Sequence, residues 1–314
     1  MTPRKATFLT MEDVRPTRAK ELARSRSDWS WYLLLLPLFA VLLVVEAYPL
    51  AYSFYFSVTN FKTGAFVGLA NYIQEFTTQA FYNSLLTSLV YSSISTVIAL
   101  AAGILLALQL SQLTKRRWLL ESVFLVPLAV SPLVVGVIFA PSGVWDDANA
   151  FWHFILGQHF FNVLSYGFYF PVMILSETWE WAPLIMLVSL GIMSSIPSDV
   201  YEAASAHGGS AWQIFMRVTL PTILRSPAMH FMIIVRFVDA MRAFEVPFTW
   251  ASWVGFSAAG SPVDTLSLYV FKLLFTQGAS FPIDYVSAVA ITLVAITLGI
   301  TAALFGIFDR TVKT

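Results

Sequence analysis

Long apolar stretches separated by short polar segments run along most of this chain. A helix that crosses a hydrocarbon core of roughly 30 Å needs about 20 mostly apolar residues. Barrel strands are shorter, about 9–11 residues, and only helices and closed barrels satisfy the backbone in lipid. The pattern therefore predicts an all-α membrane protein. Six stretches reach spanning length, at about residues 31–58, 82–110, 118–140, 168–193, 228–250 and 286–308.

The apolar part of the chain follows a polar segment. Residues 1–28 are predicted to form a polar N-terminal tail, and residues 29–314 a six-helix membrane domain. The first apolar stretch is longer than the apolar region of a secretory signal peptide, which has about 7–15 residues. We therefore interpret this stretch as an uncleaved spanning helix.

Lysines and arginines outside the apolar stretches gather on one side of the predicted membrane. Seven lie in the N-terminal tail, three at residues 115–117, two between the fourth and fifth stretches and two after the sixth. The loops on the opposite side hold only Lys62 and Lys272. Because positive residues concentrate in cytoplasmic loops, both termini are predicted to be cytoplasmic.

Composition removes several classes of function. Charged residues make up 11% of the chain, against about 25% in soluble domains. A formal net charge of zero argues against a nucleic-acid-binding protein, which needs a basic surface. The chain has no cysteine, and its four histidines lack metal-site spacing, so we expect no metal site.

The connection between the fourth and fifth stretches, residues 198–221, has the pattern of two short helices. Ser198 can cap the first helix, which the Gly208–Gly209 pair would end. Ser210 and Gln213 have the spacing of a capping box, which starts the second helix. The cytoplasmic face is therefore predicted to carry a helix–turn–helix.

The second short helix has an apolar stripe, and we expect Pro221 to close it. The first helix brings an acid, Glu202, close to this stripe. Such an element could lie on the lipid surface or dock a cytoplasmic partner. The stripe consists of Trp212, Phe215, Met216 and Leu220.

This connection resembles the EAA motif of the permease subunits of binding-protein-dependent ABC importers. The matching residues are Glu202-Ala203-Ala204, Gly208, Phe215 and Leu220-Pro221. Two positions depart from the motif, since His207 stands where the family commonly has Asp and Gly209 where it commonly has Ala.

Three further segments resemble the sugar-importer branch of that family, which includes the maltose and glycerol-phosphate permeases. Two lie in predicted outer loops, at Gly68–Tyr72 and Asp264–Tyr269, and the third at Phe237–Phe244 in the fifth stretch. The branch's outer-loop G-G-P appears only loosely, at Ala259–Pro262. The resemblance covers the chain from about residue 30 to its end.

The resemblance implies a type I ABC importer permease fold with six transmembrane helices in the cell membrane of a prokaryote. It implies several partners besides the lipid bilayer: a second homologous permease, two ATP-binding subunits and an extracytoplasmic solute-binding protein. The chain has no G-x-x-x-x-G-K-[ST] phosphate loop. We therefore expect a transport subunit that is not an enzyme and binds no cofactor itself, with ATP and Mg²⁺ on the ATPase.

In such importers the EAA helices sit in a cleft of the ATPase and pass its closure on to the permease. By resemblance, Glu202 would contact the ATPase electrostatically and Gly208 would allow the tight turn. Trp212, Phe215 and Met216 would fill the cleft. The residues assigned to coupling are Glu202, Ala203, Ala204, His207, Gly208, Trp212, Phe215, Leu220 and Pro221.

The fourth stretch carries candidates for the solute site. Ionisable residues at membrane depth are costly and functional by default, and Glu177 shares a helix face with Glu180 and Trp181. Pro183 would loosen the helix nearby. Tryptophans more commonly form interfacial belts, but this depth disfavours a belt. In the resembling maltose permease, the positions that match Glu177, Trp179, Glu180 and Trp181 line the sugar site.

The fifth stretch carries four ionisable residues spaced by three, namely Arg236, Asp239, Arg242 and Glu245. On one continuous helix, steps of about 300° would put the first and last on opposite faces. A ladder of ion pairs is the alternative to a pore lining. By resemblance Arg236 and Asp239 occupy pocket positions, and we favour these two as solute-binding residues.

Mixed charges beside tryptophans suit a neutral polyhydroxylated solute such as a saccharide or polyol. Glycerol phosphate stays open as a cargo because Arg236 could meet an anion, although two carboxylates in the fourth stretch make this cargo less attractive.

An amino-acid or peptide ABC importer is the first alternative, and the segments at Gly68–Tyr72 and Asp264–Tyr269 favour sugars over it. An ion-coupled secondary carrier would show inverted repeats and no docking loop. A membrane enzyme would need a catalytic constellation, which the sequence does not show.

Overall fold

The computed structural model describes residues 29–113, 117–157, 168–254, 263–275 and 282–313. The predicted tail over 1–28 and the loose G-G-P match at Ala259–Pro262 lie outside the described residues. Apart from one isolated bridge between Thr59 and Phe66, these residues form helices and their connections. The fold class predicted from the apolar pattern, all-α, is confirmed for the described residues.

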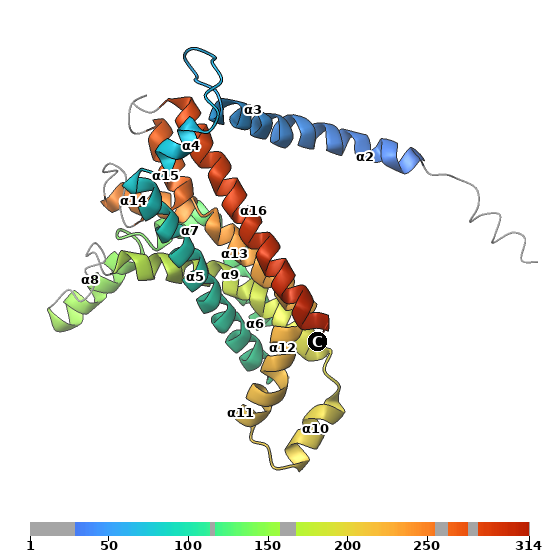
Figure 1. Cartoon of the computed structure of the whole chain (residues 1–314). Helices are drawn as coiled ribbons and strands as arrows, with labels where there is room; N and C mark the ends of the chain where they lie inside the picture. The colour runs from blue at the N-terminus through green and yellow to red at the C-terminus, as the bar shows by residue number, and fades with distance from the viewer. Residues whose placement is uncertain (1–28, 114–116, 158–167, 255–262, 276–281, 314) are drawn as a thin grey trace, which may run out of the picture. The chain divides into compact units, whose positions relative to one another are not determined.

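The helices follow one another along the chain and carry the labels of Figure 1. They are α2 Trp29–Leu42, η2 Leu43–Ala47, α3 Tyr48–Ser57, α4 Ala70–Glu75, α5 Gln79–Ser111, α6 Arg117–Phe124, η3 Val126–Ala129, α7 Pro132–Ile138, α8 Val144–Leu156, α9 Tyr169–Ser194, α10 Ser198–Ala206, α11 Ala211–Ile214, η4 Phe215–Thr219, α12 Leu220–Arg225, α13 Pro227–Met241, α14 Glu245–Val254, α15 Leu266–Phe275 and α16 Ile283–Lys313.

The chain divides into two compact units, residues 1–52 and 53–314. In the first unit α2 leads through the π turn η2 into α3. The N–H of Tyr48 donates to the carbonyl of Leu43, five residues back, immediately before Pro49. Because proline lacks an N–H and its ring clashes with the carbonyl four residues earlier, the wider turn lets the helix continue through it.

In the second unit the long helices α5 and α9 pack along each other, and α13 contacts both α5 and α16 (Figure 1). The α5–α9 contact depends on Gly103, where an added Cβ would lie 2.6 Å from the Cβ of Ile185 and 2.7 Å from the carbonyl oxygen of Ala182. Small residues let helix backbones approach closely in membranes. Ser84, Ser88, Ser92 and Ser95 of α5 are fully buried.

The third apolar stretch is bent, and so is the chain where the coupling segment leads into the fifth stretch. The helical segments on either side of Val130 and Ser131 meet at 98°, and those on either side of Ser226 meet at 68°. In both breaks the residue before a proline has extended backbone, as steric contact with the proline ring requires. The prolines concerned are Pro132 and Pro227.

Among the described residues, four helices are long and apolar enough to cross a membrane, or up to six spans if each bent pair counts as one. Helices cover all six stretches predicted from the apolar pattern. The apolar pattern did not mark α8, a 13-residue helix between the third and fourth stretches that is shorter than a span.

Candidate solute cavity and coupling segment

A cavity of about 170 Å³ lies where α9 passes the interruptions in the third and fifth stretches. α7 contributes its first residue and α9 its acidic turn, while the end of α13 and the start of α14 close the other side. Interrupted helices commonly build solute sites in transporters. The lining residues are Pro132, Glu177, Glu180, Trp181, Asp239, Arg242, Ala243, Glu245 and Val246.

Arg236 stands behind this lining and holds it by three contacts. Its Nη2 lies 2.6 Å from Oε2 of Glu177, and its Nη1 lies 3.4 Å from Oδ2 of Asp239. The guanidinium carbon is 5.1 Å from the ring centroid of Trp181, within cation–π range. Arg236 is 0% exposed and is not one of the lining residues. Through these contacts it therefore orders the acidic lining from behind.

Of the six residues predicted to bind solute, the structure brings four to the cavity, namely Glu177, Glu180, Trp181 and Asp239. Trp179 lies outside the lining, is 36% exposed and packs against Phe139 with ring centroids 5.7 Å apart. The two tryptophans lie on either side of Glu180, two positions apart, so a helix turns them to different faces.

Arg242 and Glu245, which the resemblance favoured less than Arg236 and Asp239, line the cavity. The prediction that Arg236 and Glu245 lie on opposite faces assumed one continuous helix, and that assumption is wrong. α13 ends at Met241 and α14 begins at Glu245. Pro247 was the signal in the sequence, because a proline there removes the donor for the carbonyl of Ala243.

The lining is rich in acids. It combines the carboxylates of Glu177, Glu180, Asp239 and Glu245 with one guanidinium, that of Arg242. Arg236 adds a second positive charge from behind. With all groups ionised, acidic charges outnumber basic ones around the cavity, so it suits hydroxyl donors better than anions.

The coupling segment begins with α10, whose first residue is Ser198. Ser198 is not the N-cap as predicted, because the preceding Pro197 takes that position without a side-chain hydrogen bond. Gly208 ends the helix with φ +77°, a left-handed conformation that favours glycine. This turn agrees with the predicted helix stop.

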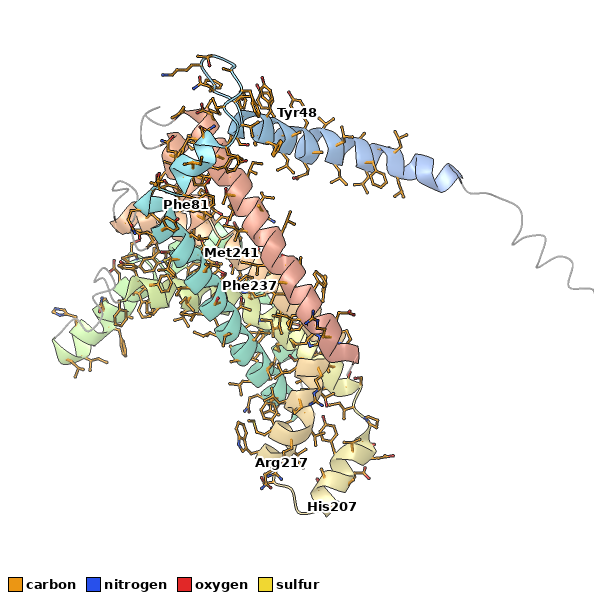
Figure 2. All side chains as sticks on the ribbon, viewed as in Figure 1. Tyr48, Phe81, His207, Arg217, Phe237 and Met241 are labelled. Atoms are coloured by element: carbon orange, nitrogen blue, oxygen red, sulfur yellow. The ribbon has the colours of Figure 1, made fainter. Side chains whose placement is uncertain are left out.

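The predicted capping box that starts the second helix is confirmed. The backbone N–H of Gln213 donates to Oγ of Ser210 at 3.3 Å, and the N–H of Ser210 donates to Oε1 of Gln213 at 2.8 Å. Side chains of His207 and Arg217, labelled in Figure 2, line a cavity of about 310 Å³ at this turn together with Gly208.

Pro221 does not close the second helix, contrary to the prediction. The π turn η4 lies directly before it, with the N–H of Leu220 bonded to the carbonyl of Phe215, and α12 continues to Arg225. As at Pro49, the wider turn accommodates the missing N–H. The helix ends only before Pro227.

The predicted apolar stripe is divided between two environments. Trp212 and Met216 are exposed, at 60% and 43%, and Glu202 on the neighbouring helix is also exposed. Phe215 is only 4% exposed and packs into the chain's own core with Ile185. In this conformation Phe215 cannot fill a cleft of a partner, contrary to the expectation from the resemblance.

The sequence and the fold both match known transport proteins. A family model described as "Binding-protein-dependent transport system inner membrane component" matches residues 99–314. The trehalose/maltose transport system permease protein MalF of Thermococcus litoralis is 28% identical over 247 residues, covering 77% of this chain and 82% of MalF. The sn-glycerol-3-phosphate transport system permease protein UgpA of Yersinia pestis biovar Antiqua is 26% identical over 295 residues, covering 91% of this chain and 96% of UgpA.

A crystal structure of a bacterial ABC transporter involved in the import of the acidic polysaccharide alginate has the same fold. It matches this chain with a TM-score of 0.74 and 23% identity, covering 93% of this chain and 98% of that chain. The likeness establishes the fold predicted from the sequence, that of an ABC importer permease.

Proposed function

The chain belongs to the family of binding-protein-dependent transport system inner membrane components, and we propose that it is the permease subunit of an ATP-driven importer for a neutral sugar or sugar-like solute. It is a multi-pass membrane protein and a transport subunit. The observation that carries the proposal for the cargo is the cavity in which Trp181 lies beside the carboxylates of Glu177 and Glu180.

The chemistry of that cavity supports a polyhydroxylated cargo. Carboxylates accept hydrogen bonds from hydroxyl groups, and such charge-assisted bonds are the stronger kind. The face of Trp181 can pack against the C–H surface of a sugar ring. The named relatives carry trehalose or maltose and glycerol 3-phosphate. The excess of carboxylates over guanidinium groups favours a neutral solute over a phosphorylated one.

The coupling segment supports an arrangement in which a separate ATPase drives the permease. Glu202, Trp212 and Met216 are exposed on neighbouring short helices, where a partner can reach them. ATP and Mg²⁺ would bind to that ATPase. A second permease, two ATP-binding subunits and an extracytoplasmic binding protein would complete the importer. We place it in the cytoplasmic membrane of a prokaryote, with both termini cytoplasmic.

Co-purification followed by reconstitution tests this proposal. The tagged full chain is purified from its native membrane in mild detergent, and co-purifying polypeptides are identified by mass spectrometry. We expect a second permease and an ATP-binding subunit. The complex, placed in liposomes with its binding protein, should accumulate radiolabelled maltose or trehalose only when ATP is supplied. A chain that purifies alone and carries solute without ATP would instead be a secondary carrier.

The cargo is tested in the same liposomes by competition. Unlabelled neutral sugars and glycerol 3-phosphate are compared as inhibitors of uptake and as ligands of the binding protein. Preferential inhibition by glycerol 3-phosphate would contradict the proposal of a neutral cargo while leaving the importer itself intact.

A further inference from the structure

The N-terminus of α15 is bonded to the backbone of the interruption between α13 and α14. Thr265, directly before α15, is 0% exposed, and its hydroxyl donates to the carbonyl oxygen of Ala243 at 2.8 Å. Two residues further on, the hydroxyl of Ser267 donates to the carbonyl oxygen of Arg242 at 3.1 Å. Two successive carbonyls of the interruption are therefore held by side chains of another element.

The carbonyl of Ala243 needs a partner because of Pro247. In an unbroken helix the carbonyl of Ala243 would accept from the N–H of residue 247, which proline lacks. A buried carbonyl without a donor is costly, and Ala243 is only 8% exposed. Thr265 supplies the missing donor, and its Oγ1 also accepts from the N–H of Leu268 at 3.4 Å, which caps α15.

α15 has its own anchors, which do not involve the cavity. The N–H of Leu266 donates to Oγ of Ser88 in α5 at 2.7 Å. Lys272 and Asp264, exposed by 1% and 0%, form an ion pair within the same segment. α15 is therefore a fixed support against which the interruption is held.

From this geometry we infer that Thr265 and Ser267 are positioning residues that set the affinity of the transporter for its solute. They hold the interruption in the conformation in which Arg242 and Glu245 line the cavity. Neither hydroxyl is part of the lining, so both act through the residues that they hold. This inference rests on the proposed function, because it assigns the affinity of that same cavity.

The first test compares Thr265→Val with Thr265→Ser in the complete transporter in liposomes. The valine variant keeps the shape but loses the donor, whereas the serine variant keeps the hydroxyl. With radiolabelled maltose as the probe, we expect Thr265→Val to raise the KM of uptake about tenfold, because this variant loses one buried hydrogen bond. Thr265→Ser should restore the parent KM, and kcat should change much less than KM.

A matched control removes a hydroxyl that holds no part of the cavity. In Thr297→Val the lost hydroxyl is one that donates within α16, to the carbonyl of Leu293 at 2.8 Å. We expect the parent KM from this variant. The inference would be overturned by a Thr265→Val transporter that keeps the parent KM, even if its kcat and its thermal stability fall. Thr265 would then be a purely architectural residue.

A second test needs no solute, so its failure is distinct from failure of the proposed function. Because the chain has no cysteine, Glu245→Cys introduces a single thiol at the cavity lining. We expect a cationic methanethiosulfonate reagent to label it at least about fivefold more slowly once Thr265→Val is added. Labelling should be unchanged with Thr265→Ser. Equal rates in all three proteins would overturn the positioning role, whatever the transporter carries.

Discussion

Glu177 of α9 and Arg236 of α13 form an ion pair, with 2.6 Å between Oε2 and Nη2, in which both side chains are almost fully buried. Nε of Arg236 has no hydrogen-bond partner within the part of the chain that the structure describes. A buried pair of this kind depends on both members, because removing one leaves an uncompensated charge. The pair therefore joins two helices and also fixes one side of the cavity.

We expect Arg236→Met to lower the free energy of unfolding by about 3–5 kcal/mol, because the carboxylate of Glu177 is left buried without its counter-charge. Adding Glu177→Gln to this variant should recover a large part of the loss. Thermal unfolding of the four proteins in detergent completes the double-mutant cycle. If the two substitutions are simply additive, the ion pair is not a coupled unit.

Glu180 lines the cavity, whereas its neighbour Trp179 lies outside the lining and packs against Phe139. Glu180→Gln should raise the KM for a neutral sugar by roughly tenfold, because a hydrogen bond to a charged group is worth about 1.5–3 kcal/mol. Trp179→Phe is the matched control and should leave the KM within about twofold. The opposite order in uptake assays would move the solute site away from this cavity.

The stability of the chain should depend on pH through Glu75 of α4. Its side chain is 0% exposed and accepts one hydrogen bond, from Thr292 at 3.0 Å. Burial raises the pKa of this carboxyl from 4.5 to about 7, and the hydrogen bond from Thr292 opposes this in part. The folded state then binds more protons between these two values, so the free energy of unfolding falls as the pH rises through them.

Glu75→Gln should therefore stabilise the protein at about pH 8, by on the order of 2–3 kcal/mol, and have little effect at about pH 4. Unfolding in detergent across that range measures the difference. Glu202→Gln, on an exposed helix, is the control and should show no such trend. A Glu75→Gln effect that is the same at both ends of the range would exclude this titration.

Gly208 tests whether the turn in the coupling segment needs its backbone conformation or its lack of a side chain. Its φ is +77°, and an added Cβ would meet nothing within 4 Å. Asparagine tolerates the left-handed region, whereas a β-branched residue does not. Gly208→Asn should keep most of the solute-stimulated ATPase activity of the assembled transporter, and Gly208→Val should lose most of it. Equal loss in both variants would show that the ATPase requires the empty space itself.

Local patterns in the sequence predicted the local features of this fold. The apolar runs that become α5, α9 and α16 and the capping box of Ser210 and Gln213 depend on residues close together in the chain. The interruption after Met241 depends in addition on a distant element, because the carbonyls of Arg242 and Ala243 are satisfied by side chains at the start of α15. A helical wheel drawn through residues 228–250 contains no information about that partner.

The face of a helix was predictable only while the helix stayed regular. Glu177, Glu180 and Trp181 reach the cavity together because α9 is unbroken around them. In the stripe of the coupling segment, Trp212 and Phe215 lie on one side of the helix, with ring centroids 5.4 Å apart, but only Phe215 is buried. Phe215 is buried because it packs with Ile185 of α9, a partner that the pattern of the coupling segment does not contain.

The two π turns also bear on how such chains can change length during evolution. A turn closed five residues back in place of four is equivalent to one residue inserted into an α-helix. Deleting one residue within Phe215–Thr219 would close the π turn to an α turn and leave the rotation of one flanking helix against the other nearly unchanged, because the wider turn already absorbs the extra residue. The shorter segment would lose the room that the wider turn gives Pro221, but not the register of its helices. A single-residue gap in an alignment of this motif therefore belongs in the π turn rather than at the glycine.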